Sequence, residues 1–501
     1  MNANPESASE QQTMRRPPLP TWDGPACKAA FERAAATRPW TLGYRSMPQE
    51  RLSTDAVPVS GKLPPGLRGV FYRNGPALHE RDGARYGHRW DGDGMVQACF
   101  IRDGSISHRG AFVRTEKFER EERAGRMLVS AFGTHLPGSE AVPARMDDLN
   151  TANINVIRVG DELLALWEPG SAYVLDPHSL ETRGLKTWAD AVAGAPFSAH
   201  PRREPDGSLW NFGVDPLGGW LFVYRIDADG TLLRHHRLQF AALPPVHDFA
   251  VTARHLVFVL PSLRVGVERL QAGASFAESC AWRPDLPMEV LAIDKDDFTV
   301  RRWELPPGYL FHIGNAWEDR QGVIRFDMMR ADAPNSLLSG WSVMRGEYRH
   351  ARGASFTLAE VHLDGRVQQT ALPDPEGEFP TVDPSEVGRR YRHVLFVGRS
   401  MQRPADVVGF DELVLADVES MTTQRFRYGD DWLVEEHLLV PDATDPAGPA
   451  RWIIGTALDL KQQVSVVSAF DAQSIASGPV AQCRLPYALP LGLHGRFEPE
   501  Q

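Results

Sequence analysis

One turn pattern recurs seven times along this 501-residue chain and limits the possible folds more than any other feature. In each copy an apolar, strand-like run ends in a turn that contains aspartate, and a second strand-like run follows, as in "VYRIDADGTLLRHHRL" and "VLAIDKDDFTVRRWEL". Aspartate suits such turns because its side chain accepts hydrogen bonds from the backbone that follows. The turn aspartates lie 51 to 73 residues apart, at Asp103, Asp176, Asp227, Asp294, Asp364, Asp417 and Asp471.

Hairpins at this interval predict an all-β fold, a seven-bladed β-propeller, because a four-stranded blade takes about 40–50 residues before insertions. A two-domain β protein with ordinary hairpins is the alternative. Helical patterns are confined to "GPACKAAFERAAATR" and to inserts such as "EKFEREERAGR", and we expect short helices and loops to cap the active-site face. The chain is therefore divided into an N-terminal arm, residues 1–40, partly disordered or helical, and a single propeller domain, residues 41–501.

Composition argues against several classes of partner and location. The formal net charge is −11, with no basic cluster, which disfavours nucleic acid or an anionic membrane surface. No stretch approaches the ~18 apolar residues of a transmembrane helix, and "MNANPESASEQQTMRRPPLP" lacks the apolar core of a signal peptide. The four cysteines are scattered singly, so a reducing cytoplasm is the expected location. The oligomeric state is left open.

Four of the sixteen histidines stand in apolar settings next to a glycine, a proline or the start of a strand: His200 in "FSAHPR", His247 in "VHDF", His312 in "FHIGN" and His494 in "LGLHGRF". They are spaced by about one, one and three blades, so a propeller could bring them together at its axis. Imidazoles suit iron, copper, nickel or zinc, although any one of them is more often a hydrogen-bonded core residue. Other histidines have charged neighbours and are interpreted as solvent-facing strand residues; they are His235, His236, His255, His350 and His437.

A metal held by neutral imidazoles needs negative charge nearby, usually carboxylates that accept the second ring N–H. Three glutamates in apolar surroundings are candidates: Glu168 at the end of "LLALWE", Glu378 in "GEFPTVDP" and Glu436 in "VEEHLLVP". Each of them alone could equally be an exposed turn residue.

From about Leu42 onward the chain resembles the carotenoid cleavage oxygenases, through "FYRNGPALHE", "HRWDGDGMV", "NTANINVIRVGDELLALWEPG", "FSAHPR", "FHIGNAWED", "GEFPTVDP" and "LGLHGRF". The resemblance implies a seven-bladed propeller whose axis holds Fe(II) through His200, His247, His312 and His494, with Glu168, Glu378 and Glu436 behind them. It also implies cleavage of a C=C bond with O2 into two carbonyl products. Where the family commonly has "NTN" this chain has "ANIN". This places Ile154 beside an open coordination position, and we expect it to screen the oxygen site.

One branch of that family cleaves phenolic stilbenes and phenylpropenoids such as isoeugenol, and this chain resembles it at Tyr44, Tyr86 and Lys117. A Tyr/Lys pair would hydrogen-bond a phenol and favour its phenolate form, so an aromatic alkene together with O2 is the expected substrate. Lys117 could equally be solvated, and Tyr86 could pack on a loop. The alternative substrate is a carotenoid or apocarotenoid, and isomerisation or hydrolysis of a polyene ester also stays open. The alternative of a different class is a propeller that binds without catalysing.

Overall fold

The computed structural model describes residues 22–138 and 143–500, and these are built mostly of β-strands. The all-β class is therefore confirmed. Part of the predicted N-terminal arm, residues 1–21, lies outside the described residues. The remainder of the arm carries helix α1 (Gly24–Ala35), which begins at an Asp23 cap whose side chain accepts from the N–H of Ala26. Among the described residues, no helix combines the length and the apolar character needed to cross a membrane.

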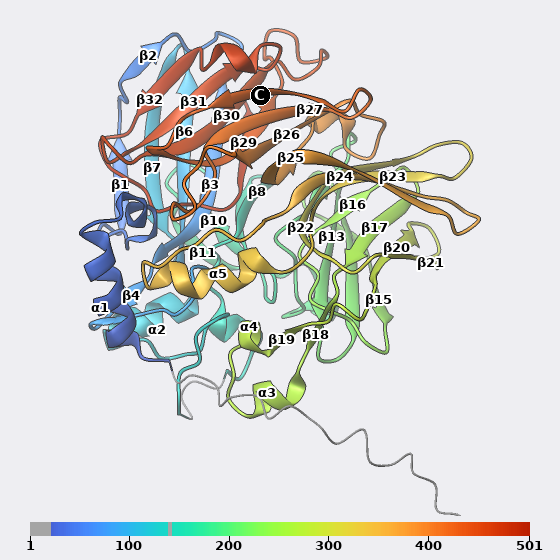
Figure 1. The fold of residues 1–501 in the computed structure, drawn as a ribbon, viewed down its shortest axis with the longest axis horizontal. Helices are drawn as coiled ribbons and strands as arrows, with labels where there is room; N and C mark the ends of the chain where they lie inside the picture. Colours follow the sequence, from blue (N-terminus) through green and yellow to red (C-terminus); the bar gives the residue numbers. More distant parts are fainter. Residues whose placement is uncertain (1–21, 139–142, 501) are drawn as a thin grey trace, which may run out of the picture.

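Six sheets of four to seven antiparallel strands make up most of the described structure (Figure 1). The N-terminal sheet has the order β1 (Arg51–Thr54), β7 (Ser105–Phe112), β6 (Asp93–Arg102), β3 (Gly69–Leu78) and β33 (Gly495–Pro499). The next three have the orders β11 (Thr182–Leu185), β10 (Tyr173–Leu175), β9 (Glu162–Leu166), β8 (Asn155–Val159); β12 (Arg202–Arg203), β13 (Leu209–Asp215), β14 (Trp220–Ile226), β15 (Leu232–Gln239); and β16 (Phe249–Val251), β17 (His255–Leu260), β20 (Met288–Asp294), β21 (Val300–Leu305).

The largest sheet has seven strands in sequential order: β22 (Tyr309–Glu318), β23 (Ile324–Ala331), β24 (Ser355–Val361), β25 (Val367–Thr381), β26 (His393–Arg399), β27 (Glu412–Asp417) and β28 (Thr422–Arg427). Its central strand β25 is long enough to pair mainly with β24 through its first half and with β26 through its second half. The C-terminal sheet has the order β2 (Val59–Gly61), β32 (Ala481–Arg484), β31 (Val464–Asp471), β30 (Trp452–Asp459) and β29 (Trp432–Val440). Two-stranded ribbons are formed by β4 (Glu80–Arg81) with β5 (Ala84–Arg85) and by β18 (Leu263–Val265) with β19 (Cys280–Trp282).

All seven hairpins expected from the turn aspartates are present; they join β6 to β7, β10 to β11, β14 to β15, β20 to β21, β24 to β25, β27 to β28 and β31 to β32. The aspartate side chains accept hydrogen bonds from the backbone of their turns, as the sequence predicts. Asp176 Oδ1, for example, accepts from the N–H groups of His178 and Ser179, and Asp417 Oδ1 accepts from those of Glu419 and Ser420. Asp103 instead adopts a left-handed φ of 52°, which aspartate tolerates better than most residues.

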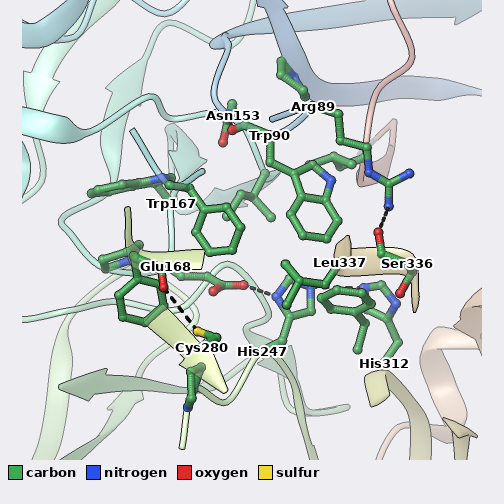
Figure 2. Close-up of a pocket in the computed structure, with 18 of the residues that line it drawn as sticks. Arg89, Trp90, Asn153, Trp167, Glu168, His247, Cys280, His312, Ser336 and Leu337 are labelled. Atoms are coloured by element: carbon green, nitrogen blue, oxygen red, sulfur yellow. Dashed lines mark hydrogen bonds and ion pairs between the residues drawn. The ribbon is translucent and has the colours of Figure 1, made fainter. Parts of the chain in front are cut away.

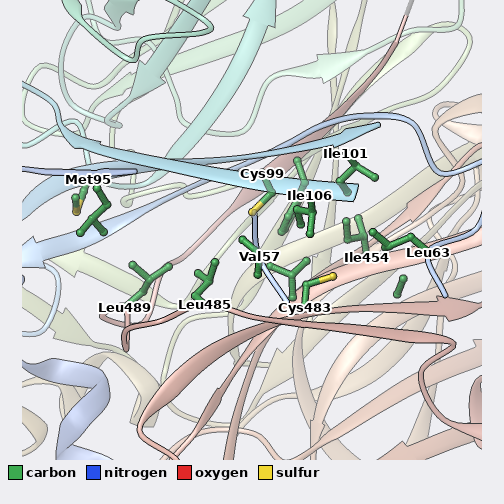
Figure 3. Packing of buried hydrophobic residues seen from close by; sticks show 14 of the residues in the cluster. Val57, Leu63, Met95, Cys99, Ile101, Ile106, Ile454, Cys483, Leu485 and Leu489 are labelled. Carbon is green, nitrogen blue, oxygen red and sulfur yellow. The ribbon is translucent and has the colours of Figure 1, made fainter. Parts of the chain in front are cut away.

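The first and last parts of the chain cross into each other's sheets. Strand β2 pairs with β32, with Val59 opposite Cys483, and β33 pairs with β3, with Phe497 opposite Phe71. Blue and red strands therefore lie side by side in Figure 1. Between the two sheets lies an apolar core, shown in Figure 3, that includes Cys99 and Cys483 as small hydrophobic residues. All four cysteines of the chain are free thiols.

The helices are short and gather in the lower half of Figure 1. Besides α1 they are α2 (Glu116–Ala124), α3 (Val267–Gln271), α4 (Phe276–Ser279) and α5 (Asn335–Met344). The sequence predicted α1 and α2 but not the last three. Residues of α3, α4 and α5 line the principal cavity, so they form part of the cover expected over one face.

Candidate metal centre

The four histidines singled out in the sequence converge on one point. Each offers a ring nitrogen, and these atoms all lie within 4.8 Å of one another. The Nε2 atoms of His200 and His247 are 3.0 Å apart, those of His247 and His312 are 3.2 Å apart, and those of His312 and His494 are 3.1 Å apart. Four lone pairs facing a common centre form a donor set suited to a transition metal.

Each histidine is positioned at an edge strand of a different sheet. His200 precedes β12, His247 precedes β16, His312 lies in β22, and His494 immediately precedes β33. Segments far apart in sequence thus meet because the inner edges of the sheets meet.

The three predicted glutamates lie behind three of the histidines, one each. Nδ1 of His312 is 2.7 Å from Oε2 of Glu378, Nδ1 of His494 is 2.9 Å from Oε1 of Glu436, and Nδ1 of His247 forms an ion-pair contact with Glu168. Such carboxylates fix the ring orientation and direct Nε2 at a metal.

His200 differs from the other three, because the nearest carboxylate oxygen, Oδ1 of Asp248, is 3.8 Å from its Nδ1.

Strand irregularities aim several of these side chains. The register of β22 shifts on both sides of Ile313, next to His312; that of β25 shifts between Glu378 and Thr381; and that of β29 shifts between Val434 and His437, where Glu436 lies. Bulges redirect side chains that a regular strand would send to a fixed face. Phe379, next to Glu378, has a φ of 61°, which shows backbone strain held at this site.

Electrostatics keep two of the imidazoles neutral. Burial lowers the pKa of His200 and of His312 well below the usual value, and the neighbouring imidazoles act in the same direction. Burial opposes protonation of His247 as well, but the Glu168 carboxylate raises its pKa. Burial also raises the pKa of Glu378 to about 8. A cation at the centre would supply the positive charge that this carboxylate lacks.

Arg202 links three of the histidine segments, a role that the sequence analysis missed. Its guanidinium donates to both Asp248 oxygens at 2.8 Å, to the carbonyl of Phe249 at 2.7 Å and to that of Ile313 at 2.5 Å. Asp248 in turn accepts from the N–H of Ile313. The signal was available, because Arg202 lies two residues after His200, and Asp248 and Ile313 directly follow His247 and His312.

Two asparagines of the quoted motifs, Asn74 and Asn155, were also missed as positioning residues. Asn74 Nδ2 donates to the carbonyls of Ala152 and Asn155, and its backbone N–H donates to the carbonyl of His494. Asn155 Nδ2 donates to the carbonyl of Ala199, next to His200. Together they fix the segments that carry the first and last histidines.

A cavity of about 1050 Å³ extends over the histidines and is lined by His247, His312 and His494. Figure 2 shows Trp90, Trp167 and Leu337 around His247 and His312. Further aromatic side chains of the lining are Phe132, Phe212, Phe276, Tyr309, Phe311 and Phe379. A large, mostly apolar space with aromatic walls and a limited number of polar groups is typical of a site for an apolar small molecule.

Ile154 and Tyr44 both line this cavity. The carbonyl of Ile154 accepts from the N–H of His494 at 3.2 Å, so Ile154 lies directly beside the histidine cluster. Tyr44 lies in a 3-10 helix, Pro39–Tyr44.

Tyr86 and Lys117, expected to bind a substrate phenol, meet each other but do not line the cavity. Lys117 Nζ is 2.9 Å from the Tyr86 hydroxyl, 2.8 Å from Asp93 Oδ1 and 2.9 Å from Glu121 Oε2, and both residues are fully buried. Burial opposes the charge of Lys117, yet these carboxylates raise its pKa well above the usual value. The ammonium is thus committed to an internal ion-pair network, because two carboxylates from other positions surround it.

Three further histidine interpretations need correction. His350 lies outside any strand, lines the cavity and pairs with Glu376, and His255 and His437 are buried. His255 Nδ1 is 2.6 Å from Glu318 Oε2, and the Nδ1 of His437 bonds the carbonyl of Glu435. The partner of His255 is thus 63 residues away in sequence, and that of His437 is the backbone of a charged neighbour, so the charged neighbours were no sign of solvent exposure.

Comparisons with known proteins agree with this geometry. Residues 44–499 match the family described as retinal pigment epithelial membrane protein. The apocarotenoid-15,15'-oxygenase of Synechocystis sp. is 29% identical over 94% of this chain and 99% of its own length. The resveratrol cleavage oxygenase 1 of Aspergillus fumigatus is 27% identical over 92% of this chain and 95% of its own. The crystal structure of the cobalt-substituted Synechocystis enzyme superposes with a TM-score of 0.84 at 27% identity, covering 92% of this chain and 98% of that one.

Proposed function

The chain belongs to the retinal pigment epithelial membrane protein family, the family of carotenoid cleavage oxygenases, and on that basis we propose that it is an Fe(II)-dependent oxygenase that cleaves a carbon–carbon double bond with O2. The observation that carries this proposal is the meeting of four histidine Nε2 atoms beside a large, mostly apolar cavity that three of these histidines line. In the reaction one alkene and one O2 give two carbonyl products, so both oxygen atoms are accounted for.

His200, His247, His312 and His494 would hold the metal, with Glu168, Glu378 and Glu436 orienting three of them. When bound, Fe(II) supplies the activation of O2 beside the alkene. The histidines are then occupied as ligands and do not act as acids or bases. The aromatic lining would hold the double bond close to the centre and keep bulk water out. Ile154 would narrow the space next to the oxygen position.

We propose that the sheets form the seven blades of a propeller. The seven-stranded sheet would contribute two blades that share β25, and each blade would carry one of the seven aspartate hairpins. The exchange of β2 and β33 between the first and last sheets would close the ring. This arrangement supports the assignment because it brings the inner edge strands, and their histidines, to one axis.

A phenolic stilbene or phenylpropenoid is our first candidate substrate. It is supported by the Tyr44 phenol in a mostly apolar lining and by similarity to a resveratrol-cleaving enzyme. Tyr86 and Lys117 do not line the cavity and do not support it. An apocarotenoid is the second candidate, favoured by the 29% identity to an apocarotenoid oxygenase and by the cavity of about 1050 Å³. A cytoplasmic location is proposed from the four free thiols.

The test is product analysis by mass spectrometry after anaerobic loading with Fe(II) and exposure to O2. A 4-hydroxystilbene, isoeugenol and an apocarotenal are assayed in parallel, and His494→Ala serves as the control without the complete histidine set. We expect two carbonyl products from at least one substrate, one O2 consumed per alkene, and neither from His494→Ala. Stoichiometric iron without product from any substrate would instead favour a binding scaffold, and failure to bind iron would overturn the metal assignment.

A further inference from the structure

Arg89 is a cation in the cavity wall that has no anionic partner among the described residues. Its Nη2 donates to the carbonyl of Ser336 at 3.3 Å (Figure 2), and its guanidinium carbon lies 4.8 Å from the centre of the Trp90 ring. Over the residues that the structure describes, no carboxylate comes within ion-pair distance of it. An unpaired charge beside apolar side chains is costly, so an anion bound at this position would be stabilising.

The five carboxylates of the lining already have partners within the protein. Asp215 accepts from the N–H groups of Leu217 and Gly218, and the other four are glutamates. Glu168 and Glu378 face His247 and His312. Glu376 pairs with His350 at 3.2 Å, and Glu435 pairs with Arg73. The Arg89 guanidinium is therefore available to pair with an anionic group of a ligand.

Arg399 also lines the cavity, but its hydrogen bonds differ from those of Arg89. Its guanidinium donates to the carbonyls of Pro404, Val407 and Gly409 at 2.7 to 3.1 Å. Its donors are used within the protein, whereas Arg89 keeps donors free.

The hydroxyl of Tyr44 lies beside Arg89 in the same wall. Burial raises the pKa of Tyr44, against the opposing effect of the nearby Arg89 charge, so the phenol keeps its proton. Because Tyr44 lines the cavity, this proton is available to an acceptor there. Arg89 and Tyr44 thus present two donors at one place in the cavity.

We propose that Arg89 and Tyr44 form a subsite for an acidic oxygen, a phenolate or a carboxylate, at one end of the alkene substrate. This inference rests on the proposed function and specifies its substrate class. Guanidinium binds oxygen anions through charge-assisted hydrogen bonds, and such a ligand would supply the missing counter-charge. The aromatic remainder of the cavity would hold the apolar part of the molecule.

The test compares acids with their methylated counterparts: a 4-hydroxystilbene with its methyl ether, and an apocarotenoic acid with its methyl ester. Arg89→Gln should raise KM for the acid of a cleaved pair by about 10- to 100-fold, the loss expected for a charge-assisted hydrogen bond, and leave KM for the methylated member within about twofold. Arg89→Lys should recover part of the loss, and Tyr44→Phe should raise KM less than Arg89→Gln does. Arg352→Gln, an exposed arginine outside the lining, is the matched control. Comparing the stilbene pair with the apocarotenoid pair shows whether the subsite binds a phenolate or a carboxylate.

Binding is measured separately on anaerobic, iron-loaded protein. A saturated 4-hydroxybibenzyl, its methyl ether, a long-chain arylalkanoic acid and its methyl ester are titrated by quenching of tryptophan fluorescence. Arg89→Gln should weaken binding of an acid without weakening its methylated partner. Equal effects on both members of each pair, or none, would overturn the subsite and leave the oxygenase intact. Iron-loaded wild-type protein that cleaves no alkene would overturn the proposed function, while the titration still decides the subsite. If Arg89→Gln does not fold, as judged by circular dichroism, Arg89→Lys and Tyr44→Phe decide the question.

Discussion

His494 and Glu436 are joined twice. Oε1 of the carboxylate lies 2.9 Å from Nδ1 of the imidazole, and Oε2 accepts the backbone N–H of Gly495 at 2.7 Å. One side chain in a bulge of β29 therefore fixes both the ring of the fourth histidine and the chain that follows it. Neither bond survives rotation of the Glu436 side chain, so the carboxylate determines whether His494 Nε2 faces the centre.

The first prediction concerns this carboxylate. Glu436→Gln keeps the shape but loses the charge and one of the two acceptors, so we expect iron affinity to fall by about 10- to 100-fold. Competition with a chelator of known affinity measures this under anaerobic conditions. Glu419→Gln, which removes a carboxylate from an exposed pair with Arg390, should leave the affinity unchanged. Equal affinities for Glu436→Gln and wild type would contradict the role.

The second prediction concerns the network around Lys117. Lys117→Met leaves Asp93 and Glu121 buried without their ammonium, which should cost about 3–5 kcal/mol in the free energy of unfolding. The double variant Lys117→Met/Glu121→Gln should recover part of that loss. Urea unfolding measures both.

Tyr86→Phe separates this structural role from substrate binding, because it removes only a hydroxyl that lies off the cavity lining. Its KM for phenolic alkenes should stay within about twofold of wild type, well under the tenfold change that 1.4 kcal/mol would produce. A large, phenol-selective increase in KM would restore the binding role that the sequence assigned to the pair.

The third prediction concerns Ile154. Ile154→Ala keeps the backbone carbonyl that accepts from His494, so full iron content is expected. The shorter side chain opens the space beside the centre, and we expect KM for O2 to change at least threefold while KM for the alkene changes less. Oxygen-electrode kinetics at several O2 concentrations measure this, with Val192→Ala, another aliphatic residue of the cavity lining, for comparison. An unchanged KM for O2 would remove Ile154 from the oxygen site.

The fourth prediction concerns pH and the buried pair of Glu318 and His255. Although burial acts in the opposite direction, hydrogen bonds from His255, Arg254 and Thr252 lower the pKa of Glu318 from 4.5 to about 2. A lowered carboxylate pKa stabilises the folded state above the unfolded value, and this stabilisation is lost as pH falls from 4.5 towards 2. Glu318→Gln should therefore cost about 2 kcal/mol at pH 6 and clearly less at pH 3.

Urea unfolding of wild type and Glu318→Gln at the two pH values measures the difference. Glu304→Gln, an exposed position on β21, should show no such pH dependence. A Glu318→Gln deficit that is the same at pH 3 as at pH 6 would show that the carboxylate charge does not contribute.

The hairpins could be predicted because their cause is local. An aspartate caps the turn that it occupies, as Asp176 and Asp417 do, so its signature lies within a few residues of sequence. Helix α5 was not foreseen, since "NSLLSGWSVM" has only a weak amphipathic pattern and no side-chain cap. Its burial against distant parts of the chain stabilises it instead.

The four histidines were recognisable from their apolar settings and from the family resemblance. The contacts that orient their rings could not be predicted from the sequence. Glu378 and Glu436 reach their histidines through bulges, which depend on the register between strands. Lys117 illustrates the same limit. Its helical partner Glu121 is four residues away, but Asp93 comes from a strand of the N-terminal sheet. Only the folded structure shows that both carboxylates form ion pairs with the Lys117 ammonium.

The late position of His494 in the sequence also sets an order of events during synthesis. A ribosome adds it 182 residues after His312, when most of the sheets have already emerged. Strand β33 then has to pair with β3, which was translated much earlier. Between the synthesis of His312 and that of His494 the nascent chain thus carries only three of the four ligand histidines, and the set of four nitrogens is complete only once β33 has paired. Iron should accordingly be held tightly only after that pairing, and chains truncated before His494 should fold in part but hold metal poorly.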